Sequence, residues 1–348
     1  RDMGFFEKLK EKARKDPRVV VLPEVALDKD GVIREAIRRV KDEGTAIPIG
    51  LTPEIIADSG KRDAFVEAYA SRKGYGDGLA DSGDRNRGLK IAERVLKRLP
   101  AEVFFADMMV EMGYADGVVA GRYITSADIA MTAKLVVGEQ EGQIISSIFF
   151  RQPPDGYPLF DLIAIADMVA NQNPSAEELY KIIVTSATTF EDLTGIAPRI
   201  AILSYITGKP QAVQITRDPE LAKIEAALEL YARGGHKWPI CQAQMDAALD
   251  TGVAKRKGAP FTDRPADLLI GPSLMLANPM YKALERLILG GQSMFITQGF
   301  RRPIMDLSRG DSAANIANVV AACSVRAQMA DQTGERRKTD TFFLKYAS

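Results

Sequence analysis

The sequence predicts a three-layer α/β fold, and three observations support this prediction. Short runs rich in β-branched residues alternate with longer segments of helical periodicity along the chain. Several of the short runs are apolar at every position, which is typical of parallel strands that helices cover on both faces. The chain has 348 residues, which is enough for one large domain or two of ordinary size.

The expected elements alternate in a regular order. Apolar runs predict strands at residues 18–24, 45–51, 115–121, 144–150, 160–167, 199–205, 266–272 and 293–299. Periodicity predicts a helical N-terminus and helices at about residues 31–43, 86–98, 125–137, 176–192, 217–233, 242–254 and 278–290, with a last helix from residue 312. The turn-rich stretch 151–158 marks a candidate domain boundary. The polar stretch 331–348 is expected as a tail that docks through Phe342 and Phe343.

Composition argues against several classes of function. Lys plus Arg equal Asp plus Glu at 46 each, which argues against a nucleic-acid partner or a polybasic membrane anchor. No stretch approaches the ~20 apolar residues that span a bilayer. Two distant cysteines, Cys241 and Cys323, suit a reducing cytoplasm. The single histidine, His236, excludes a multi-histidine zinc site and is expected in a solvated loop after a Gly-Gly helix stop.

Polar loops follow several expected strands at their carboxyl ends, where ligands of open α/β sheets bind. These loops are residues 121–130, 166–179, 204–210 and 298–312. None contains a Walker P-loop or a GxGxxG motif, so the sequence gives no support for a GTPase or a dinucleotide-binding protein.

The last of these loops contains the segment DLSRGDS directly before a helix. The first N–H groups of a helix lack intrahelical partners and lie at the positive end of its dipole, so a phosphate fits there. Gly310 allows a close approach of the backbone, and Ser308 and Arg309 add donors. The segment also reads as a helix cap, with Ser312 at the N-cap and Asn315 three residues on. The two interpretations are compatible, because a helix that Ser312 caps can also bind phosphate at its N-terminus.

Several segments together resemble the phosphate acetyltransferase and phosphate butyryltransferase family, the phosphotransacylases. The matching segments, between roughly residues 4 and 330, are ADGVVAGRYITSADIA, NQNPSAEEL, PRIAILSYIT, QMDAAL and, as the most specific, RRPIMDLSRGDS. The resemblance implies an isocitrate dehydrogenase-like architecture of two three-layer α/β domains with mostly parallel sheets and a cleft between them. The expected domains are residues 1–150 plus 297–348, and residues 151–296.

The resemblance also implies an activity and its partners. The expected reaction is the reversible conversion of acyl-CoA and phosphate to acyl phosphate and coenzyme A, with acetyl as the expected acyl group. Coenzyme A is a substrate, and no metal or other cofactor is expected. A cytoplasmic homodimer with no nucleic-acid or membrane partner is expected.

The resemblance assigns the family's functional residues to single positions of this sequence. Ser308 and Arg309 match the family's Ser–Arg pair, which holds phosphate and the developing oxyanion. Arg72 lies where the family has an arginine that would clamp an anionic group of coenzyme A or the phosphate, although a surface arginine late in a helix is an equal alternative. The other expected substrate- or CoA-binding residues are Ser126, Asp128, Met131, Tyr281, Lys282, Gly310 and Ser312.

Departures from the family pattern affect the chemistry. The family's aspartate is Asn315 here, and an amide cannot take a proton. The family's cysteine is Asp311, whose charge opposes a phosphate dianion but which is a candidate displaced base one helical turn from Asn315. A family arginine is Met131. Together with Met275, it makes the cleft more apolar and favours a longer or branched acyl chain.

Three functions are weighed against one another. The intact DLSRG segment favours an acyltransferase, because catalysis by positioning survives the loss of a proton-transfer group. The replacement of an aspartate and an arginine favours a catalytically weakened member that acts as an acyl-CoA-binding regulatory or sensor protein, as in the C-terminal domains of some malic enzymes. A metal-dependent decarboxylating dehydrogenase is the third, but no cluster of carboxylates follows Tyr281 and Lys282.

Overall fold

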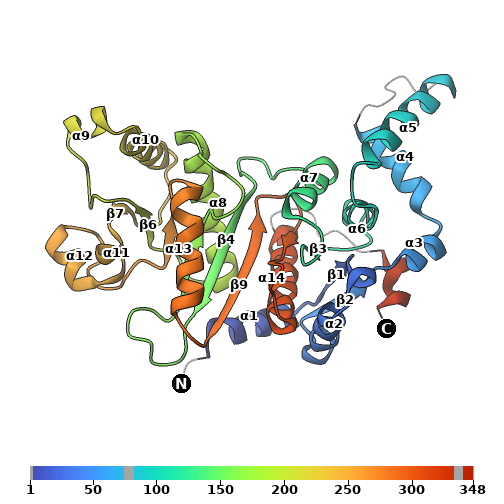
Figure 1. The fold of residues 1–348 in the computed structure, drawn as a ribbon, viewed down its shortest axis with the longest axis horizontal. Coiled ribbons are helices and arrows are strands. Elements are labelled where there is room, and N and C mark those ends of the chain that lie inside the picture. Colours follow the sequence, from blue (N-terminus) through green and yellow to red (C-terminus); the bar gives the residue numbers. More distant parts are fainter. Residues whose placement is uncertain (1–2, 74–81, 333–339, 348) are drawn as a thin grey trace. The chain divides into compact units, whose positions relative to one another are not determined.

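The computed structural model describes residues 3–73, 82–332 and 340–347. It divides into two compact α/β units (Figure 1). The first unit comprises the residues up to Leu9 with Gln140–Gly299, and the second comprises Lys10–Glu139 with the residues from Phe300 on. The expected boundary at residue 150 falls inside strand β4 (Ser146–Gln152), which pairs within the sheet of the first unit.

A four-stranded parallel sheet in the order β10-β3-β1-β2 forms the centre of the second unit. Its strands are β1 (Arg18–Leu22), β2 (Ala46–Gly50), β3 (Gly117–Ala120) and β10 (Ile304–Asp306). Every residue of β1, β3 and β10 is buried, which explains why these runs show no alternation. The register pairs Asp306 with Ala120, so the loops that leave β3 and β10 start side by side.

The described helices of the second unit form two groups, and several of them pack on other helices and not on the sheet. They are α2 (Val32–Glu43) and α14 (Ala313–Gln332) in one group, and α3 (Pro53–Ser59), α4 (Arg62–Arg72), α5 (Ser82–Leu96), α6 (Ala101–Glu111) and α7 (Ser126–Val136) in the other. Helix α14 packs on α2 and on β1, although about 300 residues separate the two ends of the chain that meet there. Helix α7 contacts β10, and α6 contacts β3.

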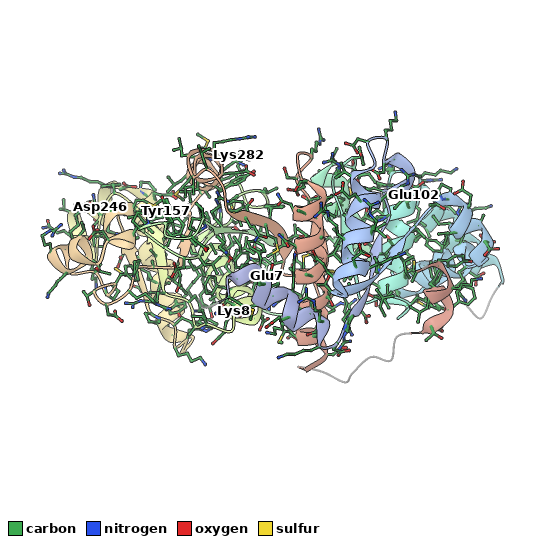
Figure 2. The ribbon with its side chains drawn as sticks, turned by 90° about the horizontal axis from the view of Figure 1, so that it is seen from below. Glu7, Lys8, Glu102, Tyr157, Asp246 and Lys282 are labelled. Atoms are coloured by element: carbon green, nitrogen blue, oxygen red, sulfur yellow. The ribbon has the colours of Figure 1, made fainter. Side chains whose placement is uncertain are left out.

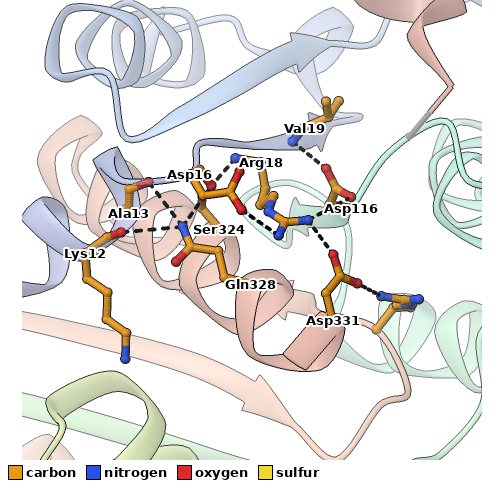
Figure 3. A network of polar contacts seen from close by, with 10 residues as sticks. Lys12, Ala13, Asp16, Arg18, Val19, Asp116, Ser324, Gln328 and Asp331 are labelled. Atoms are coloured by element: carbon orange, nitrogen blue, oxygen red, sulfur yellow. Dashed lines mark hydrogen bonds and ion pairs between the residues drawn. The ribbon is translucent and has the colours of Figure 1, made fainter. Parts of the chain in front are cut away.

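The C-terminal end of α14 is anchored by a buried polar network (Figure 3). The Asp331 carboxylate accepts hydrogen bonds from Arg18 and, at 2.9 Å, from Arg302. The Gln328 amide donates to the backbone carbonyls of Ala13, at 3.2 Å, and Asp16, at 2.8 Å. Breaking a buried ion pair leaves an uncompensated charge, so these contacts hold this end of α14 firmly. The opposite end of α14, its first turn, follows the loop that leaves β10.

A six-stranded sheet in the order β7-β6-β8-β5-β4-β9 forms the centre of the first unit. Its strands are β4, β5 (Ile163–Ala166), β6 (Ile200–Leu203), β7 (Ile240–Ala243), β8 (Leu268–Ile270) and β9 (Gln292–Gln298). Strands β5 to β8 pair in parallel, whereas β4 runs antiparallel to both β5 and β9. The mostly parallel sheet is therefore confirmed, with an antiparallel edge.

The helices of the first unit are α8 (Ala176–Thr194), α9 (Ala212–Arg217), α10 (Pro219–Arg233), α11 (Met245–Leu249), α12 (Thr251–Lys257) and α13 (Leu274–Leu287). Helix α1 (Phe5–Arg14) starts in this unit and ends in the other. A capping box between Ser175 and Glu178 starts α8 and explains the Ser-Ala-Glu-Glu sequence there. The prediction of one helix over 242–254 is wrong in part, because residues 240–243 form β7 first.

The expected solvated setting of His236 is also wrong. Its ring is half-buried and stacks on Trp238 at a centroid distance of 5.9 Å. Its Nε2 lies 3.0 Å from the Tyr180 hydroxyl. The chain that follows α10 therefore places the His236 imidazole within a cluster of aromatic side chains.

The expected docking is confirmed for Phe343, whereas Phe342 is 36% exposed and its ring lies beside Tyr114 at a centroid distance of 6.3 Å. Phe343 is fully buried, and its ring packs edge-on against Phe105 and Tyr114. The Asp340 N–H donates to the Gly113 carbonyl at 2.7 Å. Residues 333–339 of the expected tail lie outside the described residues. Among the described helices, none combines the length and the apolar character needed to cross a membrane.

Candidate functional site

The candidate site lies in the second unit, at the carboxyl ends of strands β3 and β10. One loop leads from β3 to α7 and the other from β10 to α14. The Leu307 N–H donates to the Ala120 carbonyl at 2.7 Å, which holds the two loops together where they start. Ligands of parallel α/β sheets bind at this edge, so the expected location of the site agrees with the topology.

The loop after β10 forms a tight turn at the start of α14. The Ser308 N–H donates to the Asp311 carboxylate at 2.8 Å, and the Asp311 N–H donates to the Ser308 carbonyl at 3.0 Å. Ser312 caps the helix, because its Oγ accepts the Asn315 N–H at 3.2 Å. The Asn315 side-chain amide lies 3.4 Å from the Asp311 carboxylate. The structure thus brings Asp311 and Asn315 into contact across one helical turn.

Ser308, Arg309 and Gly310 are exposed at the tip of this turn. No atom lies within 4 Å of the place where a Cβ on Gly310 would be, so the backbone is open to a ligand there. Among the described residues, no carboxylate forms an ion pair with the Arg309 guanidinium. The turn therefore presents a guanidinium, a hydroxyl and a helix N-terminus together, which is the donor set that binds phosphate.

Arg122, in the loop after β3, connects the two loops. Its Nη1 donates to the carbonyls of Arg309, at 3.1 Å, and Asp311, at 2.6 Å, and its Nη2 pairs with Asp30 at 2.6 Å. The side chain is only 11% exposed, so these contacts are largely shielded from water. The sequence interpretation missed this residue, because the local sequence around Arg122 does not predict which distant carbonyl groups its side chain contacts.

A buried carboxylate, Glu24, fixes the loop that carries Arg122. Glu24 is 1% exposed, and its Oε2 accepts the N–H groups of Gly121 at 2.9 Å and Arg122 at 3.0 Å. Its Oε1 accepts those of Tyr123 at 2.9 Å and Ile124 at 2.6 Å. A carboxylate with this many charge-assisted hydrogen bonds determines the path of the loop. The sequence interpretation missed Glu24 too, and the only local signal was the Pro-Glu that follows β1.

The last residue of β10, Asp306, is buried beside the same loop. Burial and the nearby carboxylates of Glu24 and Asp311 raise the pKa of Asp306 to about 7, although a hydrogen bond with Ser126 lowers it. Gly121 has a φ of +118°, and a Cβ added there would lie 2.1 Å from Asp306 Oδ1. Only glycine fits at this position. The charge at the floor of the site therefore changes near neutral pH.

Helix α7 starts at the same sheet edge. Thr125 is its N-cap, with its Oγ1 accepting the Asp128 N–H at 3.2 Å and donating to the Asp128 carboxylate at 2.7 Å. Ser126 contacts Asp306 at the start of the helix. Met131, within α7, is 53% exposed. Ser126 and Asp128, two of the expected substrate-binding residues, thus lie in the first turn of α7.

Arg72 lies elsewhere in this unit, at the end of α4. It forms an ion pair with Glu111 at 2.9 Å, and its Nη1 donates to the Val136 carbonyl at 3.3 Å. Val136 ends α7, which has 11 residues, so it lies ~15 Å from the start of that helix. The structure therefore places Arg72 at the end of α7 opposite to Ser126.

Three expected residues lie in the first unit, on α13. The Tyr281 ring packs against Phe149 at a centroid distance of 5.4 Å, and the Lys282 ammonium lies 4.7 Å from the Tyr281 ring centroid. Lys282 extends from the surface of this unit (Figure 2). Met275 is 82% exposed. Over the described ranges, no group of three or more His, Cys, Asp or Glu side chains is arranged to hold a metal ion.

Comparisons with known proteins identify the class to which this fold and turn belong. The family model described as "Phosphate acetyl/butaryl transferase" matches residues 4–324. The chain is 33% identical to a phosphate acetyltransferase of Thermoanaerobacterium thermosaccharolyticum, over 94% of this chain and 100% of that protein. It is 29% identical to one of Clostridium acetobutylicum, over 94% of this chain and 99% of that protein.

Solved structures agree with the sequence matches. A phosphotransacetylase from Streptococcus pyogenes superposes with a TM-score of 0.72 at 27% identity, covering 93% of this chain and 98% of that chain. A phosphotransacetylase from Staphylococcus aureus shares the fold with a TM-score of 0.70 at 23% identity, over 93% of this chain and 98% of its own. These findings define a transferase with the fold of the phosphotransacetylases.

The chain belongs to the phosphate acetyltransferase and phosphate butyryltransferase family. The resemblance inferred from the sequence segments is therefore confirmed, and so is the α/β fold class.

Proposed function

We propose that this protein is a phosphate acyltransferase that interconverts acyl-CoA plus phosphate and acyl phosphate plus coenzyme A, with acetyl as the acyl group. The observation that carries the proposal is the exposed Ser308-Arg309-Gly310 turn at the N-terminus of α14. Its donors suit a phosphate dianion. The identity of 33% to a named phosphate acetyltransferase over the whole of that protein supports the same reaction.

Positioning and charge stabilisation account for most of the proposed catalysis. Phosphate dianion is itself a nucleophile, so the protein needs to hold it against the thioester carbonyl. A phosphate oxygen bonds to the acyl carbon, the carbon–sulfur bond breaks, and the phosphate proton ends on sulfur. Ser308 and Arg309 would hold the phosphate and stabilise the negative charge that develops on the acyl oxygen.

Asp311 is the proposed carrier of that proton. Its carboxylate contacts the Ser308 N–H at 2.8 Å and the Asn315 amide at 3.4 Å, so it lies beside the proposed phosphate position. It would accept the proton from phosphate and return it to the departing sulfur, and Asn315 would orient it. Net protons balance, because phosphate loses one and coenzyme A gains one.

The other expected features stay proposals. We propose that Gly310 and Ser312 line the phosphate position, and that Arg72, Ser126, Asp128, Met131, Tyr281 and Lys282 contribute to binding of acyl-CoA. A cytoplasmic homodimer that needs no metal is proposed as well, and the two free cysteines suit a reducing compartment.

Thiol release tests this function. The purified protein is incubated with phosphate and separately with acetyl-, propionyl- and butyryl-CoA, and free thiol is followed with a chromogenic disulfide. We expect release that requires phosphate and falls about 10²–10³-fold in Arg309→Ala. Arg39→Ala is the control, because Arg39 is an exposed partner of Glu35 on α2. No release from any acyl-CoA, with tight acyl-CoA binding by calorimetry, would overturn the proposal in favour of a sensor.

The exposed Met131 is proposed to influence the choice of acyl chain. Compared with an arginine, an apolar side chain there would let longer or branched acyl groups bind in addition to acetyl. We expect Met131→Arg to raise the ratio of acetyl-CoA to butyryl-CoA turnover. An unchanged ratio contradicts this role of Met131.

A further inference from the structure

We propose that Arg122 is a positioning residue that presets the Ser308–Asp311 turn for phosphate. This inference rests on the proposed function, because it assigns phosphate to that turn. Arg122 does not itself need to touch the ligand. It acts through the backbone, by holding the carbonyls of Arg309 and Asp311 at 3.1 and 2.6 Å from its Nη1.

Peptide geometry explains how these two contacts orient donors. The C=O and N–H of a trans peptide point in opposite directions, because the peptide unit is planar. When Arg122 holds the carbonyls of Arg309 and Asp311 on one side, the N–H groups of the following residues, Gly310 and Ser312, point to the other side. In the described ranges of the chain, no acceptor takes a hydrogen bond from either N–H group. Both donors are thus aimed away from Arg122 and available to an anion.

Arg122 is itself held before any ligand arrives. Its loop is fixed by the four backbone hydrogen bonds to Glu24, and its Nη2 pairs with Asp30 at 2.6 Å. Tyr123, the next residue, donates its hydroxyl to the same Asp30 carboxylate. Hydrogen bonds from Tyr123 and Arg122 lower the pKa of Asp30, so this pair stays ionised. A turn that is already ordered loses less entropy when it binds its ligand.

The chain offers a matched control for this role. Arg34, on α2, also donates to two backbone carbonyls, those of Asp28 at 2.6 Å and Val25 at 3.0 Å. It makes no contact with the Ser308–Asp311 turn in the described structure. Arg34→Ala therefore removes the same kind of interaction from the same unit, and the turn loses none of its own contacts.

The test measures the KM for phosphate, the KM for acyl-CoA and kcat in Arg122→Ala, Arg122→Lys and Arg34→Ala. We expect Arg122→Ala to raise the KM for phosphate about 10–100-fold, because two hydrogen bonds from a charged donor are lost, with the KM for acyl-CoA changed less than about twofold. Arg122→Lys is expected to lie between wild type and Arg122→Ala, since an ammonium cannot span both carbonyls and Asp30. Millimolar guanidinium ion is expected to restore part of the phosphate affinity of Arg122→Ala only.

Several outcomes would overturn the proposal. The first is an unchanged KM for phosphate in a folded Arg122→Ala. The second is an equal rise in the KM for phosphate and the KM for acyl-CoA. The third is the same rise in the KM for phosphate in Arg34→Ala. Melting curves establish whether each variant folds. If Arg122→Ala does not fold, the phosphate KM of Arg122→Lys is compared with that of wild type in its place. If the wild-type protein shows no turnover, the proposed function fails. Calorimetry of phosphate binding then tests the inference separately. The inference predicts a lower phosphate affinity in Arg122→Ala and an unchanged affinity in Arg34→Ala.

Discussion

Replacing Asp311 by asparagine separates the two effects that its carboxylate is proposed to have. Asp311→Asn keeps the shape of the side chain and an oxygen to accept the Ser308 N–H, which lies 2.8 Å from the carboxylate. It removes the negative charge and the capacity to take a proton. The electrostatic and chemical consequences appear in different kinetic constants.

The expected change in phosphate affinity follows from Coulomb's law. A phosphate bound to the same turn would have its centre about 5 Å from the carboxylate, because N–H···O contacts are about 2.9 Å long. A dianion and a single charge about 5 Å apart repel each other by about 1.7 kcal/mol at the dielectric constant of water. Removing the charge is therefore expected to lower the KM for phosphate about 20-fold.

Turnover is expected to become slower although phosphate binds more tightly. Loss of a general acid–base group costs about 10²–10⁴ in rate, so kcat is expected to fall by at least about 10²-fold. Initial rates at varied phosphate and saturating acetyl-CoA give both constants, with Asp42→Asn, on the exposed side of α2, as the control. A lower KM for phosphate with unchanged kcat would refute the proton-carrier role, and an unchanged KM would refute the proximity of the charge.

Three further predictions concern stability, each measured by urea unfolding. Glu24→Gln is expected to lower the free energy of unfolding by about 2–4 kcal/mol, because an amide oxygen cannot accept all four N–H groups that the carboxylate accepts. The control is Glu35→Gln on the exposed face of α2, which is expected to lower the free energy of unfolding by less than about 0.5 kcal/mol. Gly121→Ala is expected to cost more than about 2 kcal/mol, because its Cβ would clash with Asp306 and its φ is +118°; a neutral effect contradicts the packing. Burial raises the pKa of Asp107, so the folded state holds a proton that the unfolded state loses near pH 4, and stability falls as pH rises above that value. Asp107→Asn is therefore expected to stabilise the protein more at pH 8 than at pH 5, and an equal effect at both contradicts the shift.

The sequence predicted the fold wherever a local pattern was sufficient. Strands such as β1 and β3 were found because their uniformly apolar runs are typical of buried parallel strands. Strand β10 was missed because it has only three residues and ends in a charged one, Asp306. Helix α6 was missed because residues 103–110 are all buried, so it lacks the polar face that gives a helical period.

The candidate site could be predicted only in its local part. The cap at Ser312 and the contact between Asp311 and Asn315 follow from spacing within one turn of a helix. The contacts of Glu24 and Arg122 join residues 97 and 189 positions apart, and no single sequence says which distant polar groups meet. The supports of the phosphate turn therefore required the structure.

Formation of acyl phosphate tests the central proposal most directly. The protein is incubated with acetyl-CoA and phosphate, and the product is trapped with hydroxylamine as the hydroxamate while free thiol is counted in parallel. We expect one acyl phosphate for each thiol in wild type, and a loss of about 10²-fold or more in Arg309→Ala. Thiol release without acyl phosphate, or equal yields from wild type and Arg309→Ala, would contradict the assignment of phosphate to the turn at the start of α14.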